Sequence, residues 1–160
     1  MNVLQISSVV CSFVSLLLLL LSLGSNYWVM NGDRHAGLWN LCDPTVCVSF
    51  GLHVGVVDHI ARALMLLGMI GGAVSFFGLC ATFFKSQVGS MSLMKTSANA
   101  SILAAFWALI AMASFTGVTS HLTVSYGWSF SLGWASCLLF LITGVLTHLA
   151  RRDLSGAESF

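Results

Sequence analysis

Two closely spaced cysteines, Cys42 and Cys47, are the residues best suited to covalent or metal chemistry in this sequence. Four residues separate them, including an aspartate and a proline, which favour turns, so a disulfide would close a short turn. The alternative is a zinc site, because two thiolates supply half of a tetrahedral ligand set. His35, His53 and His59 lie nearby, but their spacing follows no zinc-finger pattern. The pattern favours the disulfide and predicts neither a metal nor another cofactor.

The charged side chains supply no further catalytic arrangement. Six basic and five acidic residues occur in the chain, and they form no paired carboxylates and no phosphate-binding loop. None lies near the middle of a long apolar stretch, where proton relays and ion-coupled transporters keep ionisable residues. The sequence predicts a protein that is not an enzyme and has no ion-coupling residues. The charges stand at Asp33, Arg34, Asp43, Asp58, Arg62, Lys85, Lys95, Arg151, Arg152, Asp153 and Glu158.

The composition excludes a soluble globular domain. Hydrophobic residues make up 58% of the 160 residues, charged residues only 7%, and the mean hydropathy is +0.95. Soluble domains average roughly 25% charged residues, so these charges could not cover a water-facing surface. A net charge of +1 gives no polyanion-binding surface, which excludes nucleic acid as a partner. We expect an integral membrane protein in contact with the lipid bilayer.

Long uncharged stretches define the membrane spans. They occupy residues 1–32, 63–84 and 96–150, and a helix needs about 20 apolar residues to cross a bilayer. The third stretch holds two spans because polar residues interrupt it near residues 119–127. A cleaved signal peptide is the alternative for the first span, but no basic segment precedes it. The prediction is one four-pass domain over 1–160, with helices at 3–23, 60–84, 97–118 and 128–149, a first loop at 24–59 and a tail at 150–160.

The basic residues predict the orientation of the helices. Lys and Arg accumulate in short cytoplasmic loops. Four of the six basic residues lie between the second and third helices or in the tail, so both termini should be cytosolic and residues 24–59 should lie outside the cell. That oxidising compartment favours the Cys42–Cys47 disulfide. The four residues are Lys85, Lys95, Arg151 and Arg152.

The first loop is the only loop long enough to fold by itself, and it predicts β-structure. Residues 40–50 are rich in β-forming types, and residues 52–57 partly alternate between apolar and polar or small types. Trp39 is expected to be a core anchor, with an exposed contact as the alternative. Arg62 follows Asp58 by four residues, so one helical turn would place them side by side. Arg62 is expected to tie the loop to the bundle rather than to act as a gating charge.

Small residues mark the packing faces of the second and third helices. Gly68 and Gly72 form a GxxxG pair, and Ala100, Ala104 and Ala108 repeat the same spacing. Such faces let helices approach closely in lipid. Packing inside the bundle is the favoured interpretation, and contact between copies is the alternative.

Two features on the predicted cytosolic side suggest modification or binding. Cys80, near Lys85 at the end of the second helix, is a candidate for S-palmitoylation, with a buried inert thiol as the alternative. The sequence Glu158–Ser159–Phe160 ends in a hydrophobic residue that a PDZ-type scaffold could capture by strand addition.

A wider set of residues resembles a known family. Asn26–Tyr27–Trp28, then Gly37–Leu38–Trp39, then Cys42 and Cys47 resemble the signature of the claudin, peripheral myelin protein and epithelial membrane protein superfamily. The resemblance covers nearly the whole chain: residues 61–65 are similar to the arginine-bearing start of the second helix, and residues 127–134 to the start of the fourth. The residues that carry the signature are Trp28, Gly37, Leu38, Trp39, Cys42, Cys47 and Arg62.

The resemblance implies an all-α membrane fold, a left-handed four-helix bundle capped by a small extracellular antiparallel sheet. The short first loop looks most like those of lens-fibre and claudin-domain-containing members, whereas tight-junction claudins have a longer loop and wider cysteine spacing. The resemblance to these members implies a role in cell–cell contact or membrane organisation at the plasma membrane or cell junctions. The partners would be a homo-oligomer or related four-pass proteins, in cis or across facing membranes. The alternatives are a trafficking accessory in the granule membranes of cytotoxic cells, which similarity to a killer-cell granule member suggests, and a pore or channel-regulatory subunit.

Overall fold

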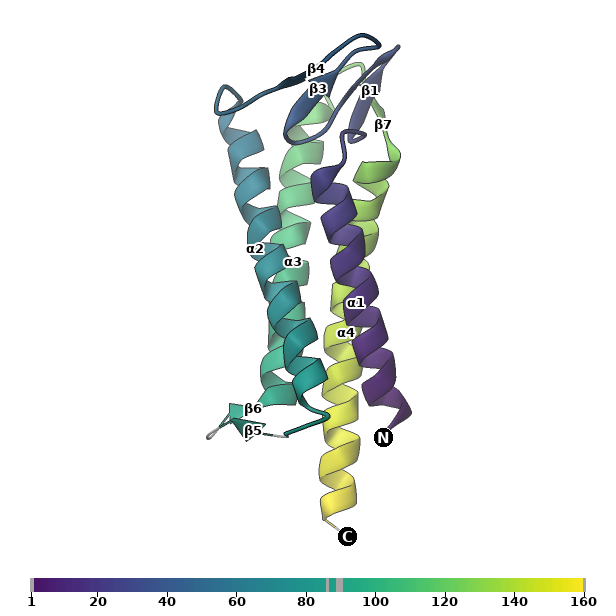
Figure 1. Cartoon of the computed structure of the whole chain (residues 1–160), viewed down its shortest axis with the longest axis vertical. Coiled ribbons are helices and arrows are strands. Elements are labelled where there is room, and N and C mark those ends of the chain that lie inside the picture. Colours follow the sequence, from purple (N-terminus) through teal and green to yellow (C-terminus); the bar gives the residue numbers. More distant parts are fainter. Residues whose placement is uncertain (1, 86, 89–90, 160) are drawn as a thin grey trace.

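Four long helices run side by side, and a β-sheet lies across one end of them (Figure 1). The computed structural model describes residues 2–85, 87–88 and 91–159. Each helix is long and apolar enough to cross a membrane, which agrees with the four predicted spans. The helices are α1 (Val3–Gly24), α2 (Val56–Ala81), α3 (Leu93–Thr119) and α4 (Trp128–Glu158).

Three helices differ by more than one residue from the hydropathy-based ranges, and of these α3 begins at Leu93 rather than at residue 97. Helix α2 begins at Val56, because Gly55 takes the N-cap position and Asp58 places an acidic group in the first turn, where it favours a helix. The expected β-pattern of residues 52–57 is therefore wrong. Helix α4 continues to Glu158 through the expected tail. Hydropathy identifies only the membrane-spanning part of a helix. Charged residues such as Arg151 and Arg152 are good helix formers, so the backbone hydrogen bonds of α4 continue past them.

The sheet is antiparallel and combines two separate loops. Its strand order is β4–β3–β2–β1–β7, so the strand before α4 pairs with the first strand after α1. A short pair, β5 (Gln87–Val88) and β6 (Met91–Ser92), lies at the opposite end of the bundle (Figure 1). The five strands are β1 (Val29–Asn31), β2 (Arg34–Ala36), β3 (Asn40–Cys42), β4 (Cys47–Ser49) and β7 (Ser125–Tyr126).

Small residues line the interface between α2 and α3. A Cβ added at Gly71 would lie 3.3 Å from the Ala104 Cβ, and one added at Gly68 would lie 3.4 Å from the Ala104 carbonyl oxygen. Ser75 and Ser101 hydrogen-bond across the same interface at 2.6 Å. The small-residue face of α2 therefore packs inside the bundle, which was the favoured interpretation of its spacing.

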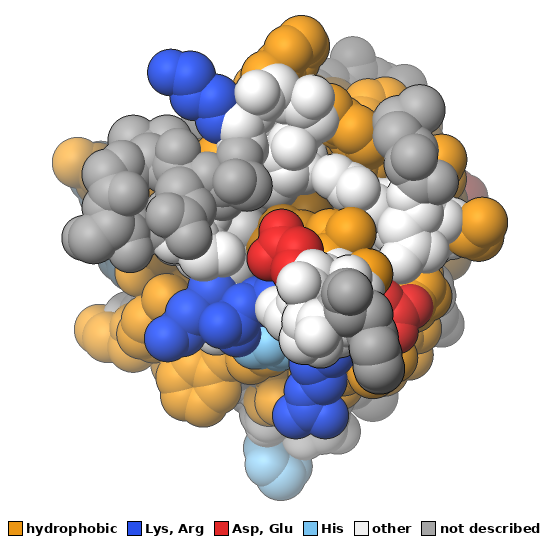
Figure 2. Space-filling model, turned by 90° about the horizontal axis from the view of Figure 1, so that it is seen from below, with side chains coloured by type: hydrophobic (Ala, Val, Ile, Leu, Met, Phe, Trp, Pro, Cys, Tyr) orange, Lys and Arg blue, Asp and Glu red, His pale blue; other side chains and the backbone are white. Residues whose placement is uncertain are grey.

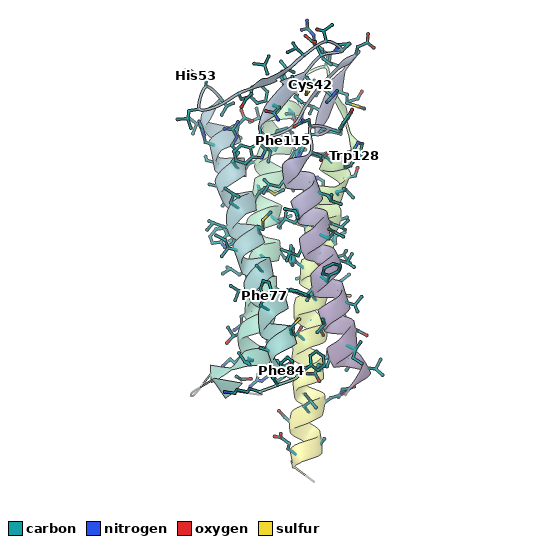
Figure 3. All side chains as sticks on the ribbon, viewed as in Figure 1. Cys42, His53, Phe77, Phe84, Phe115 and Trp128 are labelled. Carbon is teal, nitrogen blue, oxygen red and sulfur yellow. A yellow bond between two sulfur atoms is a disulfide. The ribbon has the colours of Figure 1, made fainter. Side chains whose placement is uncertain are left out.

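Many large apolar side chains lie on the outside of the bundle, whereas its interior combines a few large apolar residues with many small and hydroxyl side chains. Phe77 is 66% exposed on α2 (Figure 3), while Ser12 and Ser15 of α1 are fully buried. Lipid tails are as apolar as leucine, so the helices gain little by hiding large apolar groups from them. Close approach of small residues stabilises the bundle instead.

Candidate functional site

The junction between the sheet and the bundle is built around Trp28. Its side chain is fully buried, its Nε1 donates to the Ser22 carbonyl oxygen at 2.7 Å, and its ring meets the Phe115 ring edge-on at 4.9 Å. Phe115 lies just beneath the sheet (Figure 3). The Trp28 main chain accepts from the amide of Gly127 and donates to the Ala36 carbonyl. One residue thus links α1, β2, α3 and the start of α4.

Gly37 lets the chain pass close to the end of α1. A Cβ at this position would overlap the Ser25 carbonyl oxygen and lie 2.8 Å from the Asn26 Cα, both of which are backbone atoms. Leu38 follows and is 2% exposed within the core. Gly37 therefore allows the close approach of the sheet to α1, and Leu38 packs the sheet against the core of the bundle.

Arg62 ties α2 to the loop that it supports. Its Nε donates to the Leu38 carbonyl oxygen and its Nη1 to the Gly51 carbonyl oxygen, both at 2.8 Å. The guanidinium also lies against the Trp39 ring, whose Nε1 donates to the Leu23 carbonyl oxygen at 2.9 Å. Trp39 is half-buried against the core, so it serves as the expected anchor.

The expected neighbour of Arg62 is not its partner. Among the described residues, the hydrogen bonds of its side chain go to main-chain carbonyls, and Asp58 makes no ion pair with it. Arg62 is 5% exposed and its guanidinium reaches the Leu38 and Gly51 carbonyls, whereas Asp58 lies beside Gly55 at the helix start. The spacing of Asp58 and Arg62 correctly placed both in one turn of a helix. The acceptors of Arg62 could not be predicted, because every residue has a main-chain carbonyl.

The Cys42–Cys47 disulfide is confirmed in the structure. The two residues are directly paired in the register of β3 and β4, and Cys42 is buried whereas Cys47 is exposed. The bond closes the hairpin at its turn (Figure 3 labels Cys42). Because the two sulfurs are bonded to each other, the zinc alternative is excluded for this pair.

The turn between the cysteines is held by one carboxylate. The Asp43 Oδ1 accepts from the Thr45 hydroxyl at 2.7 Å, from the Thr45 amide at 2.9 Å and from the Val46 amide at 3.0 Å. These bonds, led by that of the hydroxyl, lower the pKa of Asp43 below its ordinary value of 3.8, because they stabilise the charged form. The hairpin tip therefore carries a fixed negative charge.

An apolar patch lies on the same hairpin. Leu41 of β3 is paired with Val48 of β4, so their side chains are neighbours on one face, and they are 40% and 58% exposed. Val46, two residues before Val48, is 54% exposed. Since β4 is an edge strand, this hairpin patch (Leu41, Val46, Val48) is open to a partner.

The loop between α3 and α4 contributes contacts to the junction that were not predicted from the sequence. The Ser22 hydroxyl donates to the Ser129 carbonyl oxygen at 2.8 Å, and the Ser25 and Ser129 hydroxyls contact each other. With β7, these contacts join α4 to the end of α1. The β-forming types just before Gly127 were the available signal, but two residues are too few to distinguish a strand from a turn.

The structure brings the seven signature residues together, whereas the modification and PDZ candidates, Cys80 and Phe160, are not part of that group. Cys80 lies one residue before the end of α2, far from the sheet, and is half-buried. It stays a candidate for lipidation. Phe160, on which the PDZ hypothesis depends, lies outside the described residues.

Four spanning helices that carry a disulfide-linked sheet across one end define a four-pass membrane protein. The chain belongs to the PMP-22/EMP/MP20/Claudin family, whose family model matches residues 1–147. The resemblance found in the sequence is thus confirmed, as is the claudin-like fold.

Curated relatives agree with this assignment. The chain is 27% identical to the lens fiber membrane intrinsic protein of Bos taurus, over 89% of this chain and 88% of that protein. It is 29% identical to Protein NKG7 of Mus musculus, over 80% and 79%. It is 24% identical to Claudin domain-containing protein 2 of Homo sapiens, over 98% and 92%.

Proposed function

We propose that this protein is a structural, non-enzymatic component of cell membranes that makes contacts through its first outer loop. The hairpin patch carries the proposal. Leu41 of β3 and Val48 of the edge strand β4 are paired side by side and face water, although apolar residues of a small sheet gain by being buried. The disulfide and the Asp43 turn hold the patch in one shape, so little ordering is needed when a partner binds.

The partner in this proposal is a second copy or a related four-pass protein, beside it or in a facing membrane. A patch of three side chains buries far less than the roughly 1,200–2,000 Å² of a stable protein interface. Single contacts would therefore be weak, and many copies would act together through avidity. The proposed location is the plasma membrane, at sites where membranes meet, with the sheet outside the cell.

The test is to express the protein in cells that lack related proteins and to image it where cells touch. The wild type should concentrate at these contacts. The double variant Leu41→Thr, Val48→Thr should reach the surface but stay evenly spread, because threonine keeps the β-preference and removes apolar area. Replacing the whole loop would be less informative, since Leu38 and Trp39 belong to its core.

A matched control is Leu122→Thr, which changes another exposed apolar residue near the same end of the bundle. This variant should concentrate at contacts as the wild type does. If the double variant also concentrates normally, the activity does not lie in the hairpin patch. Accumulation of the wild type in internal vesicles would favour the trafficking role, and a conductance of the purified protein in vesicles would favour the pore.

A further inference from the structure

A cavity of about 440 Å³ opens at the end of the bundle opposite the sheet. This size lies within the roughly 300–1,000 Å³ of small-molecule sites. Figure 2, which views this end, shows basic and acidic side chains close to its middle. The cavity is separate from the hairpin patch, and its occupant does not depend on the proposed contact role.

One face of α4 forms a wall of this cavity. Four residues of α4 line it, at positions i, i+3, i+4 and i+7, which lie on one side of a helix. They are Arg151, Leu154, Ser155 and Glu158. This face exists because α4 continues past its apolar span. The wall thus carries a cation, an apolar group, a hydroxyl and a carboxylate in that order along the helix.

The opposite wall is held in place by hydrogen bonds. Gln5 of α1 is 7% exposed, and its amide nitrogen donates to the Thr82 hydroxyl oxygen at 2.8 Å. Thr82 in turn donates to the Leu79 carbonyl oxygen at 2.6 Å. The buried Met94 adds apolar surface. This side of the cavity is fixed before any ligand binds.

The two charges of the cavity are unpaired in the described part of the chain and lie in a defined order. Arg151 is half-buried and makes no hydrogen bond or ion pair there, so it is available to an anionic oxygen. Glu158 follows seven residues later, about 10 Å further along the helix axis at 1.5 Å per residue. The positive group is therefore nearer the bundle and the negative group nearer the water.

We propose that this cavity binds the head group of an aminophospholipid, with Arg151 on the phosphate and Glu158 on the ammonium. Such a head group has its phosphate on the membrane side and its ammonium on the water side, in the same order as the two protein charges. A purely anionic head group would meet repulsion at Glu158. Leu154 and Met94 provide apolar surface for the glycerol end of a lipid, which a small soluble zwitterion would leave unused.

The experiment measures the lipids that the purified full-length protein keeps after equilibration with vesicles of phosphatidylethanolamine and phosphatidylglycerol in equal amounts, with identical acyl chains. Native mass spectrometry counts the bound lipids. The wild type should keep more phosphatidylethanolamine. Arg151→Gln should reduce its retention by about tenfold, the effect of losing one strong charge-assisted bond. Glu158→Gln, a change in an exposed side chain that leaves the bundle intact, should reverse the preference.

Arg152→Gln is the matched control, because it removes the same charge from the neighbouring exposed residue. Its lipid retention should equal that of the wild type. Equal losses in Arg151→Gln and Arg152→Gln, or no loss in Arg151→Gln, would overturn the proposal. So would a wild-type preference for phosphatidylglycerol. Displacement of the lipid by an equal concentration of free phosphoethanolamine would assign the cavity to a soluble ligand and overturn the lipid assignment.

Discussion

The guanidinium carbon of Arg62 lies 4.8 Å from the centre of the Trp39 ring. The same arginine donates through Nε to the carbonyl of Leu38, the residue before that tryptophan. A cation against an aromatic face, removed from water, is stabilised by the ring and by its hydrogen bonds. Arg62 and Trp39 therefore form a joint through which α2 holds the sheet.

Replacing Arg62 with alanine should loosen the sheet from the bundle. The variant leaves the Leu38 and Gly51 carbonyls without their donor, and we expect a loss of about 2–4 kcal/mol for two charge-assisted bonds. The thermal unfolding midpoint in detergent should fall. Arg62→Lys should recover only part of the stability, because an ammonium group cannot reproduce the planar guanidinium that donates to both carbonyls at once. Arg34→Ala, an exposed strand arginine, is the control; an equal effect there would contradict the joint.

Removing the disulfide should destabilise the hairpin more than the helices. Cys42→Ser, Cys47→Ser should cost roughly 2 kcal/mol, since the bond closes a small ring. Membrane insertion should persist, because the apolar spans direct it, whereas surface delivery should fall. Peptide mass spectrometry without reduction should show the Cys42–Cys47 link in the wild type. A link from either cysteine to another chain would refute the assignment.

Two helical glycines should respond oppositely to alanine. A Cβ at Gly72 would lie 2.6 Å from the Phe140 Cζ and 3.2 Å from the Leu16 Cδ1, so Gly72→Ala should cost about 1–3 kcal/mol through overpacking. A Cβ at Gly117 would meet nothing within 4 Å. Gly117→Ala should be neutral or stabilising by up to about 1 kcal/mol. Thermal unfolding of the two variants compares them directly, and similar destabilisation would argue against tight packing at Gly72.

The hairpin turn should respond to acid. Because the folded pKa of Asp43 lies below 3.8, its carboxylate contributes stability that is present above the unfolded pKa and is lost as the pH falls through the folded pKa. The NMR amide shifts of Thr45 and Val46 should therefore titrate with a midpoint below 3.8. Asp43→Asn should abolish this titration. A midpoint at or above 3.8 would mean that the three hydrogen bonds do not form in solution.

The membrane orientation can be tested with epitopes. A tag after Phe160 should stain only permeabilised cells, and a tag inserted after Gly32, in the turn between β1 and β2, should stain intact cells. The expectation rests on the excess of Lys and Arg at the end opposite the sheet. Staining of the C-terminal tag on intact cells would reverse the proposed topology.

Elements that depend on local composition could be predicted from the sequence. The spans follow from uncharged stretches, and the Cys42–Cys47 bond follows from spacing and compartment. The partners of Arg62 could not be predicted, because main-chain carbonyls have no residue signature. The extension of α4 was missed because charged residues end a hydropathy segment without ending a helix, and the cavity face beginning at Arg151 was missed with it.

The pairing of β1 with β7 has a consequence for exchanging parts between family members. Val29 is opposite Tyr126, so a strand following α1 is completed by residues almost a hundred positions later. A donor's first loop moved alone into another member would arrive without its neighbouring strand and without the Ser129 contacts. Chimaeras that carry residues 25–54 together with 120–130 should keep the donor's surface, whereas single-loop grafts should lose it. The sheet end of this protein is thus a composite unit that has to be exchanged as a whole.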